Sequence, residues 1–321
     1  MPRLHRSDPN GAGLRRTGDP RHLYLDAGGR PVKDPEVLQR IESLVIPPAW
    51  TDVWISPDPL GHIQAVGTDA AGRRQYIYHQ LWRARRDSAK FDRALLLARS
   101  MSFARGSVSR DLSRTGFPQS RALAAAFRII DLSSLRIGSE EYLRSNRSRG
   151  LTTLLLRHVS VEGETVRLDF RAKSGTDWES SLTDAALAAY VSELLAARGQ
   201  RSRLLVWRDR AWRIVRPADV NDDIRRRTRQ EVTAKDFRTL RGTVVAARTL
   251  ALIGPETTER ARATAITESV RRTAAVLGNT PAVARSSYID PRVFDRYRAG
   301  RLIDLRPGRS AEHALIDLLE S

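Results

Sequence analysis

Apolar and polar residues alternate over short runs in the first quarter of the chain, a pattern typical of β-strands. Residues 50–56, 62–66 and 74–78 follow it, and turn sequences rich in proline, aspartate and glycine separate them. A helix is predicted before them, over residues 35–44. We therefore expect a small β-rich domain over residues 21–88.

The residues before this domain have a different character. Residues 1–20 are basic and polar, and they contain no apolar stretch of the kind found in a signal peptide. We expect them to form a flexible basic arm. Apolar stretches elsewhere in the chain are too short to span a bilayer, so the sequence predicts a cytoplasmic protein rather than a membrane protein.

Beyond residue 79 the apolar positions recur at three- and four-residue spacing, the period of an amphipathic helix. This part is predicted to form a second, larger domain over residues 89–321. Two of its helix starts carry capping signals, which are Thr233 with Asp236 and Thr280 followed by a proline. The predicted helices cover residues 79–105, 120–131, 139–145, 183–198, 219–230, 234–252, 255–277 and 291–298.

One group of strand-like runs interrupts the helices. Residues 152–156, 165–170 and 177–182 are predicted strands, and a turn containing Lys173-Ser174-Gly175 joins the last two. Residues 203–207 have a similar pattern and are a possible partner for them. The predicted fold class is α+β, with a β-rich N-terminal domain and a mainly α-helical domain that contains a short β-hairpin or three-stranded sheet.

The charge of the chain points to a polyanionic partner. Its 55 basic and 37 acidic residues give a formal net charge of +18, which favours nucleic acid over an acidic membrane surface. The chain has no cysteine, which excludes disulfides, thiolate nucleophiles and zinc ribbons. Its six histidines are scattered, and the sequence has neither a metal-binding pattern nor a P-loop. We therefore expect no metal and no cofactor.

The basic residues are strongly biased toward arginine. Only four of the 55 are lysine, namely Lys33, Lys90, Lys173 and Lys235. Lysine can release a proton when its pKa is lowered, whereas arginine stays charged at any working pH. Lys173 lies in the predicted hairpin and Lys235 lies three residues before Arg238, so these two are candidates for proton transfer. Lys33 and Lys90 have no motif around them and are predicted to be ordinary surface residues.

Five polar residues of the second domain suit a single reaction, the attack of a tyrosine on a phosphodiester. Arg136 and Arg238 can stabilise the negative charge that builds up on the phosphate oxygens, and Asn279 can donate a further hydrogen bond. Lys173 can protonate the leaving oxygen. Tyr288, beside such cations, becomes a competent nucleophile. A covalent phosphotyrosine keeps the bond energy, so resealing requires neither ATP nor a metal.

The surrounding motifs resemble those of the small, poxvirus-like type IB DNA topoisomerases of viruses and bacteria, and the resemblance covers nearly the whole chain. Arg136 begins an Arg-Ile-Gly-x-Glu-x-Tyr motif that ends at Tyr142. Lys173 begins Lys-Ser-Gly, and Arg238 lies in Lys-Asp-x-Arg-Thr. Tyr288 lies in Ser-Tyr-Ile-x-Pro. Asn279 precedes Thr-Pro, at a position where poxvirus members carry histidine, so its contribution is expected to be smaller.

The resemblance implies the catalytic fold shared by these topoisomerases and the tyrosine recombinases, and a set of site residues. Tyr288 would be the nucleophile that joins a 3′ phosphate, and Lys235 would assist proton transfer by Lys173. The cut strand would swivel and reseal, so the enzyme would relax supercoiled DNA. We expect a monomer, bound to double-stranded DNA in the nucleoid, whose two domains close around the duplex. The residues expected to contact DNA are Gln75, Tyr76, Tyr78, Tyr142 and Arg241.

Other interpretations of the same residues stay open at this point. Arg136 could form a surface ion pair with Glu140, and Tyr288 could be a half-buried aromatic like Tyr297. The three arginines of residues 225–227 are interpreted as a solvated or phosphate-facing helix surface. A tyrosine recombinase is the nearest alternative enzyme, but recombinases usually have His-x-x-Arg where this chain has Lys235. A basic nucleoid-coating protein would account for the net charge but would not require the ordered set of Arg136, Lys173, Arg238, Asn279 and Tyr288.

Overall fold

The computed structural model describes residues 2–18, 24–172 and 177–321. Contacts between Cα atoms divide the chain into two compact units, Met1–Ala89 and Lys90–Ser321. The boundary falls within one long helix, α2 (Gln80–Leu112). No helix in the described part of the chain has both the length and the apolar character needed to cross a membrane.

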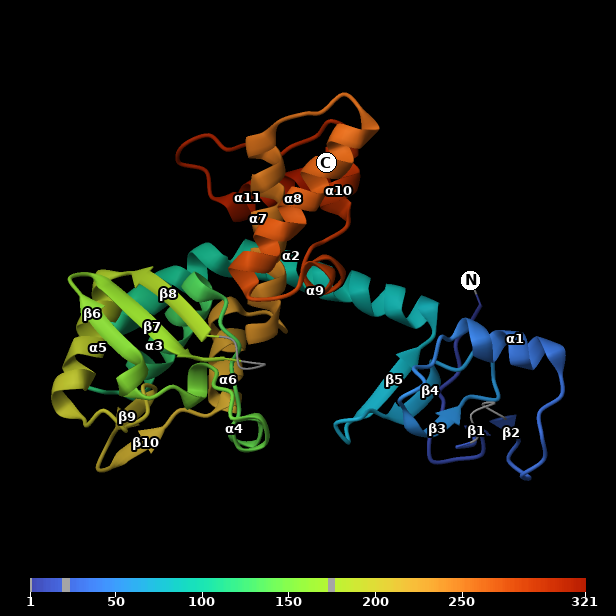
Figure 1. The fold of residues 1–321 in the computed structure, drawn as a ribbon. Helices are drawn as coiled ribbons and strands as arrows, with labels where there is room; N and C mark the ends of the chain where they lie inside the picture. Colours follow the sequence, from blue (N-terminus) through green and yellow to red (C-terminus); the bar gives the residue numbers. More distant parts are fainter. Residues whose placement is uncertain (1, 19–23, 173–176) are drawn as a thin grey trace. The chain divides into compact units, whose positions relative to one another are not determined.

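The N-terminal unit is built on an antiparallel sheet of five strands in the order β2-β1-β3-β4-β5 (Figure 1). Its short helix α1 (Pro35–Ser43) begins at Asp34, whose carboxylate accepts a hydrogen bond from the backbone N–H of Glu36 at 2.9 Å. Ile41 of α1 is buried against strands β3 and β4. The strands are β1 (Leu14–Arg16), β2 (Tyr24–Leu25), β3 (Thr51–Ile55), β4 (Ile63–Thr68) and β5 (Arg74–Tyr78).

The expectation of a free arm over residues 1–20 is wrong for the described part of that segment. Strand β1 pairs with β3 through Leu14 and Ile55, and Leu14 belongs to the core of this unit. Ser7 also joins the sheet, because its hydroxyl donates to the carbonyl oxygen of Ile63 at 3.0 Å. One buried leucine and a few backbone hydrogen bonds therefore hold this basic segment on the domain.

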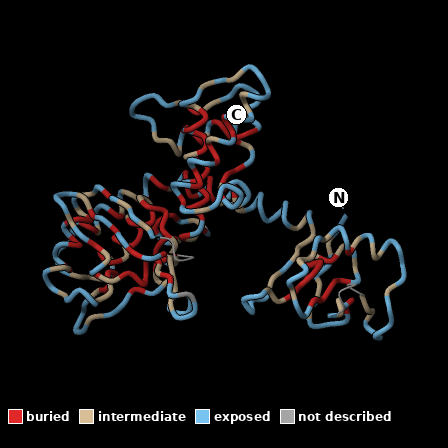
Figure 2. Tube along the Cα trace, in the orientation of Figure 1, coloured by how far each residue is buried: buried red, intermediate tan, exposed pale blue. Residues whose placement is uncertain are grey.

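The second unit is mainly helical and has one large core. Helix α7 is mostly buried (Figure 2), and helices α8, α10 and α11 pack against it (Figure 1). Helix α3 contacts α5, α6 and α7. Besides α2, the helices are α3 (Gln119–Ser133), α4 (Glu140–Asn146), α5 (Ala185–Ala197), α6 (Pro217–Thr228), α7 (Ala234–Ile253), α8 (Glu259–Leu277), α9 (Pro281–Ser287), α10 (Arg292–Arg298) and α11 (Ala311–Glu320).

A three-stranded antiparallel sheet lies in the same unit, in the order β6-β7-β8. Its strands are β6 (Val159–Glu162), β7 (Thr165–Arg171) and β8 (Asp177–Thr183). The strand predicted over residues 152–156 is wrong, because two 3₁₀ turns, Leu151–Thr153 and Leu156–His158, occupy that region. All residues from 152 to 156 except the half-buried Leu155 are buried, so a mostly buried irregular segment has the composition of a strand.

The segment predicted as a further partner of this sheet makes a hairpin of its own. Strand β9 (Val206–Arg208) pairs with β10 (Trp212–Ile214), and only Arg203 forms an isolated bridge, to Leu155. The predicted α+β class is confirmed, with a five-stranded N-terminal sheet followed by a largely helical unit that contains small sheets.

Candidate active site

Arg136 lies in a tight loop directly after α3. The helix ends at Ser134, which has the left-handed conformation with φ 55°, and the buried Leu135 follows it. The guanidinium of Arg136 donates from Nη2 to the Oδ1 of Asn279 at 2.7 Å. Glu140, the alternative partner, instead accepts from Arg203 at 2.6 Å. The structure therefore directs Arg136 toward the segment that carries Asn279.

The glycine of the Arg-Ile-Gly motif is required by the close approach of two chain segments. Gly138 has φ 75°, and a Cβ atom there would lie 2.8 Å from the Cα of Gly150. A Cβ atom on Gly150 would in turn lie 2.7 Å from the carbonyl oxygen of Arg136. The backbone N–H of Leu151 donates to that same carbonyl at 2.9 Å. These contacts fix the backbone from which the Arg136 side chain extends.

Arg238 lies on α7 and is only 2% exposed. Its Nη1 donates to the carbonyl oxygen of Ser134 and its Nη2 to that of Leu277, both at 2.8 Å. The two bonds tie α7 to the ends of α3 and α8. Burial, and then the positive charge of Arg136, lower the pKa of Arg238. A bound anion would relieve both costs.

Tyr288 follows α9 directly, and its ring lies against Arg238, whose guanidinium carbon is 4.9 Å from the ring centroid. Burial alone would raise the pKa of Tyr288, but a hydrogen bond with Arg238 and then the positive charges of Arg238, Arg136 and Lys235 lower it below the ordinary value of 10. Tyr297 differs, because it is buried, its hydroxyl donates to the carbonyl oxygen of Gly254, and burial raises its pKa. Of these two tyrosines, only Tyr288 lies in an environment that favours the phenolate form.

Asn279 follows Gly278, the left-handed residue that ends α8, with φ 58°. Its Oδ1 accepts from Arg136, whereas its Nδ2 is buried and has no hydrogen-bond partner among the described residues. The Nε of Arg238 is also buried and has no hydrogen-bond partner among the described residues. Buried donors are normally hydrogen-bonded, so the two are available to an acceptor that the described residues do not supply.

Of the two lysines considered for proton transfer, one falls outside the described residues. This residue is Lys173. The strands on either side of it, β7 and β8, pair with each other, and Arg171 opposite Asp177 is the first pair. Trp178, the next residue of β8, packs close to Gly278, where an added Cβ atom would lie 3.0 Å from its ring. Lys235 is exposed at the start of α7, and its charge contributes to the lowered pKa of Tyr288.

The residues expected to bind DNA lie on both units. In β5, the rings of Tyr76 and Tyr78 stack with centroids 6.0 Å apart, and Tyr76 is 40% exposed. Gln75 points to the opposite face of the strand, and its amide donates to Asp69 at 2.9 Å. In the second unit, Tyr142 on α4 and Arg241 on α7 are both exposed.

Lys90, predicted to be an ordinary surface residue, makes an exposed contact close to Tyr288. Its Nζ donates to the carbonyl oxygen of Ser286 at 3.2 Å, two residues before Tyr288. On the other side of Tyr288, Arg292 pairs with the buried Asp290 at 2.7 Å and with Asp92 of α2 at 3.2 Å. Helix α2 thus contacts the chain on both sides of Tyr288. These contacts join residues that are far apart in the sequence, so no local motif indicates them.

The arginine run at residues 225–227 is not a uniform surface. Arg227 is only 2% exposed, and its Nε donates to Asp223 at 2.6 Å while its Nη2 donates to Asp111 at 2.7 Å. Arg225 pairs with Asp222 at 2.5 Å. The solvated interpretation is therefore wrong for Arg227, whose role is to join α6 to α2.

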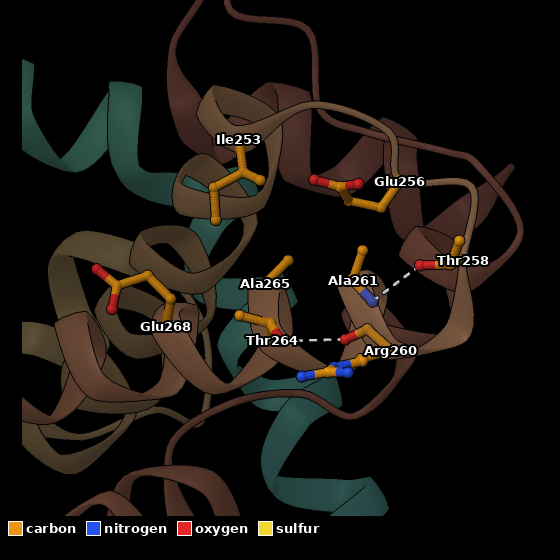
Figure 3. A pocket seen from close by; sticks show the side chains of 8 residues that line it. All are labelled: Ile253, Glu256, Thr258, Arg260, Ala261, Thr264, Ala265 and Glu268. Atoms are coloured by element: carbon orange, nitrogen blue, oxygen red, sulfur yellow. Dashed lines mark hydrogen bonds between the residues drawn. The ribbon is translucent and has the colours of Figure 1, made fainter.

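A shallow pocket of about 420 Å³ lies where α7 ends and α8 begins (Figure 3). Its lining is largely apolar, with Ile253, Ala261 and Ala265, and Glu268 at one side. None of the candidate catalytic residues lines it. The candidate active site is thus a set of converging side chains rather than this pocket.

Comparisons with known proteins agree with these motifs. The family described as "Eukaryotic DNA topoisomerase I, catalytic core" matches residues 79–299, and "Bacterial DNA topoisomerase IB, N-terminal domain" matches residues 21–69. The chain is 29% identical to "DNA topoisomerase 1B" of Acanthamoeba polyphaga mimivirus over 81% of this chain and 80% of the relative. It is 27% identical to "DNA topoisomerase 1B" of vaccinia virus (strain Copenhagen) over 45% of this chain and 46% of the relative.

The first match spans all the candidate catalytic residues, and the second lies within the N-terminal unit. The resemblance inferred from the motifs is confirmed, and a topoisomerase is favoured over a recombinase or a coating protein. The chain belongs to the type IB DNA topoisomerases, and its N-terminal domain and viral relatives place it with their small, bacterial and poxvirus-like members.

Proposed function

We propose that this topoisomerase relaxes supercoiled duplex DNA through a covalent intermediate on Tyr288. The phenolate oxygen of Tyr288 attacks the phosphorus, the bond from phosphorus to the 5′ oxygen breaks, and Lys173 gives that oxygen a proton. The enzyme is then attached to the 3′ phosphate. After the free end has rotated, its 5′-hydroxyl attacks the phosphotyrosine and restores both the strand and Tyr288.

One observation carries this proposal. The Nε of Arg238 and the Nδ2 of Asn279 are buried donors without a partner among the described residues, and Tyr288 lies against Arg238. A phosphodiester supplies oxygen acceptors of the kind that such donors lack. Arg136, held by Asn279, adds a second guanidinium. This arrangement supports binding of a phosphate whose charge increases during attack by Tyr288.

DNA would be held mainly through its phosphates, because the net charge is +18. In our proposal the domain of residues 21–88 and the catalytic domain of residues 89–321 close around the duplex as a monomer in the nucleoid. Tyr76 and Tyr78 are exposed or half-buried on one face of β5 and would contact the duplex from that face, and Gln75 would contact it from the opposite face of this edge strand. Tyr142 and Arg241 would contact the duplex from the catalytic domain. Alanine at Gln75 or at Tyr76 should weaken DNA binding or change the choice of site, and normal footprints for both variants would refute that role.

The proposal is tested by relaxation of a supercoiled plasmid in excess EDTA and without ATP. The wild-type protein should relax the plasmid, whereas Tyr288→Phe should bind DNA normally and leave it supercoiled. Tyr297→Phe is the matched control, because Tyr297 also lies among arginines but its hydroxyl bonds to Gly254. Relaxation by Tyr288→Phe would exclude Tyr288 as the nucleophile, and an absolute requirement for magnesium would exclude the metal-free mechanism.

A further inference from the structure

Helix α7 comes unusually close to the backbone of Tyr288 at Gly242. A Cβ atom on this glycine would lie 2.5 Å from the carbonyl oxygen of Tyr288 and 3.1 Å from its Cβ. Gly242 is in the interior of a helix, where glycine is less favourable than alanine, and its backbone does not have the positive φ that would require glycine. The close approach of Tyr288 is therefore the physical reason for glycine here.

The next residue, Thr243, bonds to the backbone on both sides of Ile289. Its hydroxyl oxygen accepts from the backbone N–H of Asp290 at 3.1 Å. The hydroxyl proton has two acceptors within reach, the carbonyl oxygen of Thr239 at 2.9 Å and that of Tyr288 at 3.3 Å. Thr243 is 3% exposed, so water does not replace these bonds easily.

The same helix also holds the ring of Tyr288. Arg238 is four residues before Gly242, so the two lie on one face of α7. Its guanidinium carbon is 4.9 Å from the centroid of the Tyr288 ring. Arg238 thus contacts the ring, while Gly242 and Thr243 contact the backbone that carries it. One rigid element therefore determines both where the tyrosine lies and how its ring faces the candidate phosphate donors.

We infer that Gly242 and Thr243 are positioning residues for the nucleophile, acting through the backbone of Tyr288 rather than through DNA. This inference rests on the proposed role of Tyr288. Displacing a reacting group by about 1 Å can reduce a rate by about 10²-fold. Substitutions at Gly242 or Thr243 should therefore slow the formation of the covalent intermediate without weakening DNA binding.

The experiment measures single-turnover formation of the covalent complex on a duplex oligonucleotide, with DNA affinity and thermal unfolding measured on the same proteins. Gly242→Ala and Thr243→Val should cleave about 10²-fold more slowly with unchanged affinity. Thr243→Ser keeps the hydroxyl and should restore cleavage to within a few-fold of wild type. This rescue separates positioning from a general loss of packing, because serine fills less space than valine.

Two control variants are matched to the test variants. Thr249 lies on α7, is 4% exposed, and donates to the carbonyl oxygen of Val245 at 2.8 Å, so Thr249→Val removes a comparable hydroxyl away from the tyrosine. Gly106 of α2 has open space around its Cβ position, so Gly106→Ala adds a methyl group without a clash. Both controls should cleave at the wild-type rate.

The pH dependence of cleavage provides a second readout. If the backbone of Tyr288 moves away from Arg238, the pKa of the phenol should rise, and the rate of Thr243→Val should reach its plateau at higher pH than that of Thr243→Ser. Wild-type rates for Gly242→Ala and Thr243→Val, or equal losses in Thr243→Val and Thr243→Ser, would overturn the inference. Should Gly242→Ala fail to fold, the comparison of Thr243→Val with Thr243→Ser tests the inference by itself. Covalent complex formation by Tyr288→Phe would instead overturn the proposed function.

Discussion

The guanidinium of Arg238 lies against the ring of Tyr288, with its central carbon 4.9 Å from the ring centroid, while its two terminal nitrogens are bonded to backbone carbonyls. Its Nε is also buried and has no hydrogen-bond partner among the described residues. The arrangement requires the full fork of arginine, because a lysine ammonium cannot reach Ser134, Leu277 and a ligand together.

Arg238→Lys should therefore lower the cleavage rate by about 10²–10³-fold, the usual cost of losing one donor to a developing oxyanion. It should also lower the free energy of unfolding by about 1–3 kcal/mol, because a buried carbonyl loses its partner. Arg248→Lys is the matched control, because Arg248 is an exposed arginine of α7 with no proposed role in binding or catalysis. Single-turnover cleavage and thermal unfolding measure the two effects, and an Arg238→Lys protein with wild-type cleavage would contradict the assigned role.

Asn279 should act as a donor through its Nδ2. Asn279→Asp keeps an oxygen acceptor for Arg136 but replaces the donor with negative charge, so cleavage should fall by about 10²-fold or more. Asn221→Asp is the matched control, because the Oδ1 of Asn221 accepts from the backbone of Ala234 and aspartate can do the same. Equal cleavage rates in the two variants would show that Asn279 serves only as an acceptor for Arg136.

Lys173 should be the general acid. Lys173→Arg keeps the charge but cannot give up a proton, so cleavage should fall by about 10²–10⁴-fold while DNA binding persists. A DNA substrate with a sulfur atom at the bridging 5′ position needs no proton for its leaving group, so this substrate should restore cleavage. Lys33→Arg, at an exposed position of the N-terminal unit, should behave as wild type. Absence of rescue by sulfur would remove Lys173 from this role.

Lys235 has two possible contributions, which pH profiles can separate. Burial raises the pKa of Tyr288, while Arg238, Arg136 and Lys235 lower it more. Removing the charge in Lys235→Gln should raise the pKa of Tyr288, so the increase of the cleavage rate with pH should move to higher pH. Lys235→Arg keeps the charge and should leave the profile in place. A lower rate for Lys235→Arg at every pH would show that Lys235 also transfers a proton.

A candidate catalytic set could be proposed from the sequence because each member lies within a short local motif. Arg136 is an example, because Gly138, which the close approach of Gly150 requires, belongs to the same short motif. Most of the long helices were also predicted, because their apolar period is local. The contact of Lys90 with the segment before Tyr288 could not be predicted in this way, because its acceptor is the backbone carbonyl of Ser286, 196 residues later in the chain.

Errors in the fold prediction have the same physical origin. The run at residues 152–156 consists of threonine and leucine and is mostly buried, and burial alone does not distinguish a strand from a 3₁₀ turn. Arg227 resembles its exposed neighbours in sequence, but Asp111 from a distant helix neutralises it. Strand β1 has only three residues, too few for a periodic signal.

The central claim is that Tyr288 forms a covalent bond with a 3′ phosphate, and identification of the adduct tests it most directly. Cleavage of a duplex labelled separately on each side of the break, followed by proteolysis and mass spectrometry, identifies both the residue and the DNA end. We predict a 3′-phosphotyrosyl linkage on the peptide that contains Tyr288, and no adduct in Tyr288→Phe. An adduct on another residue, or on a 5′ phosphate, would contradict the account.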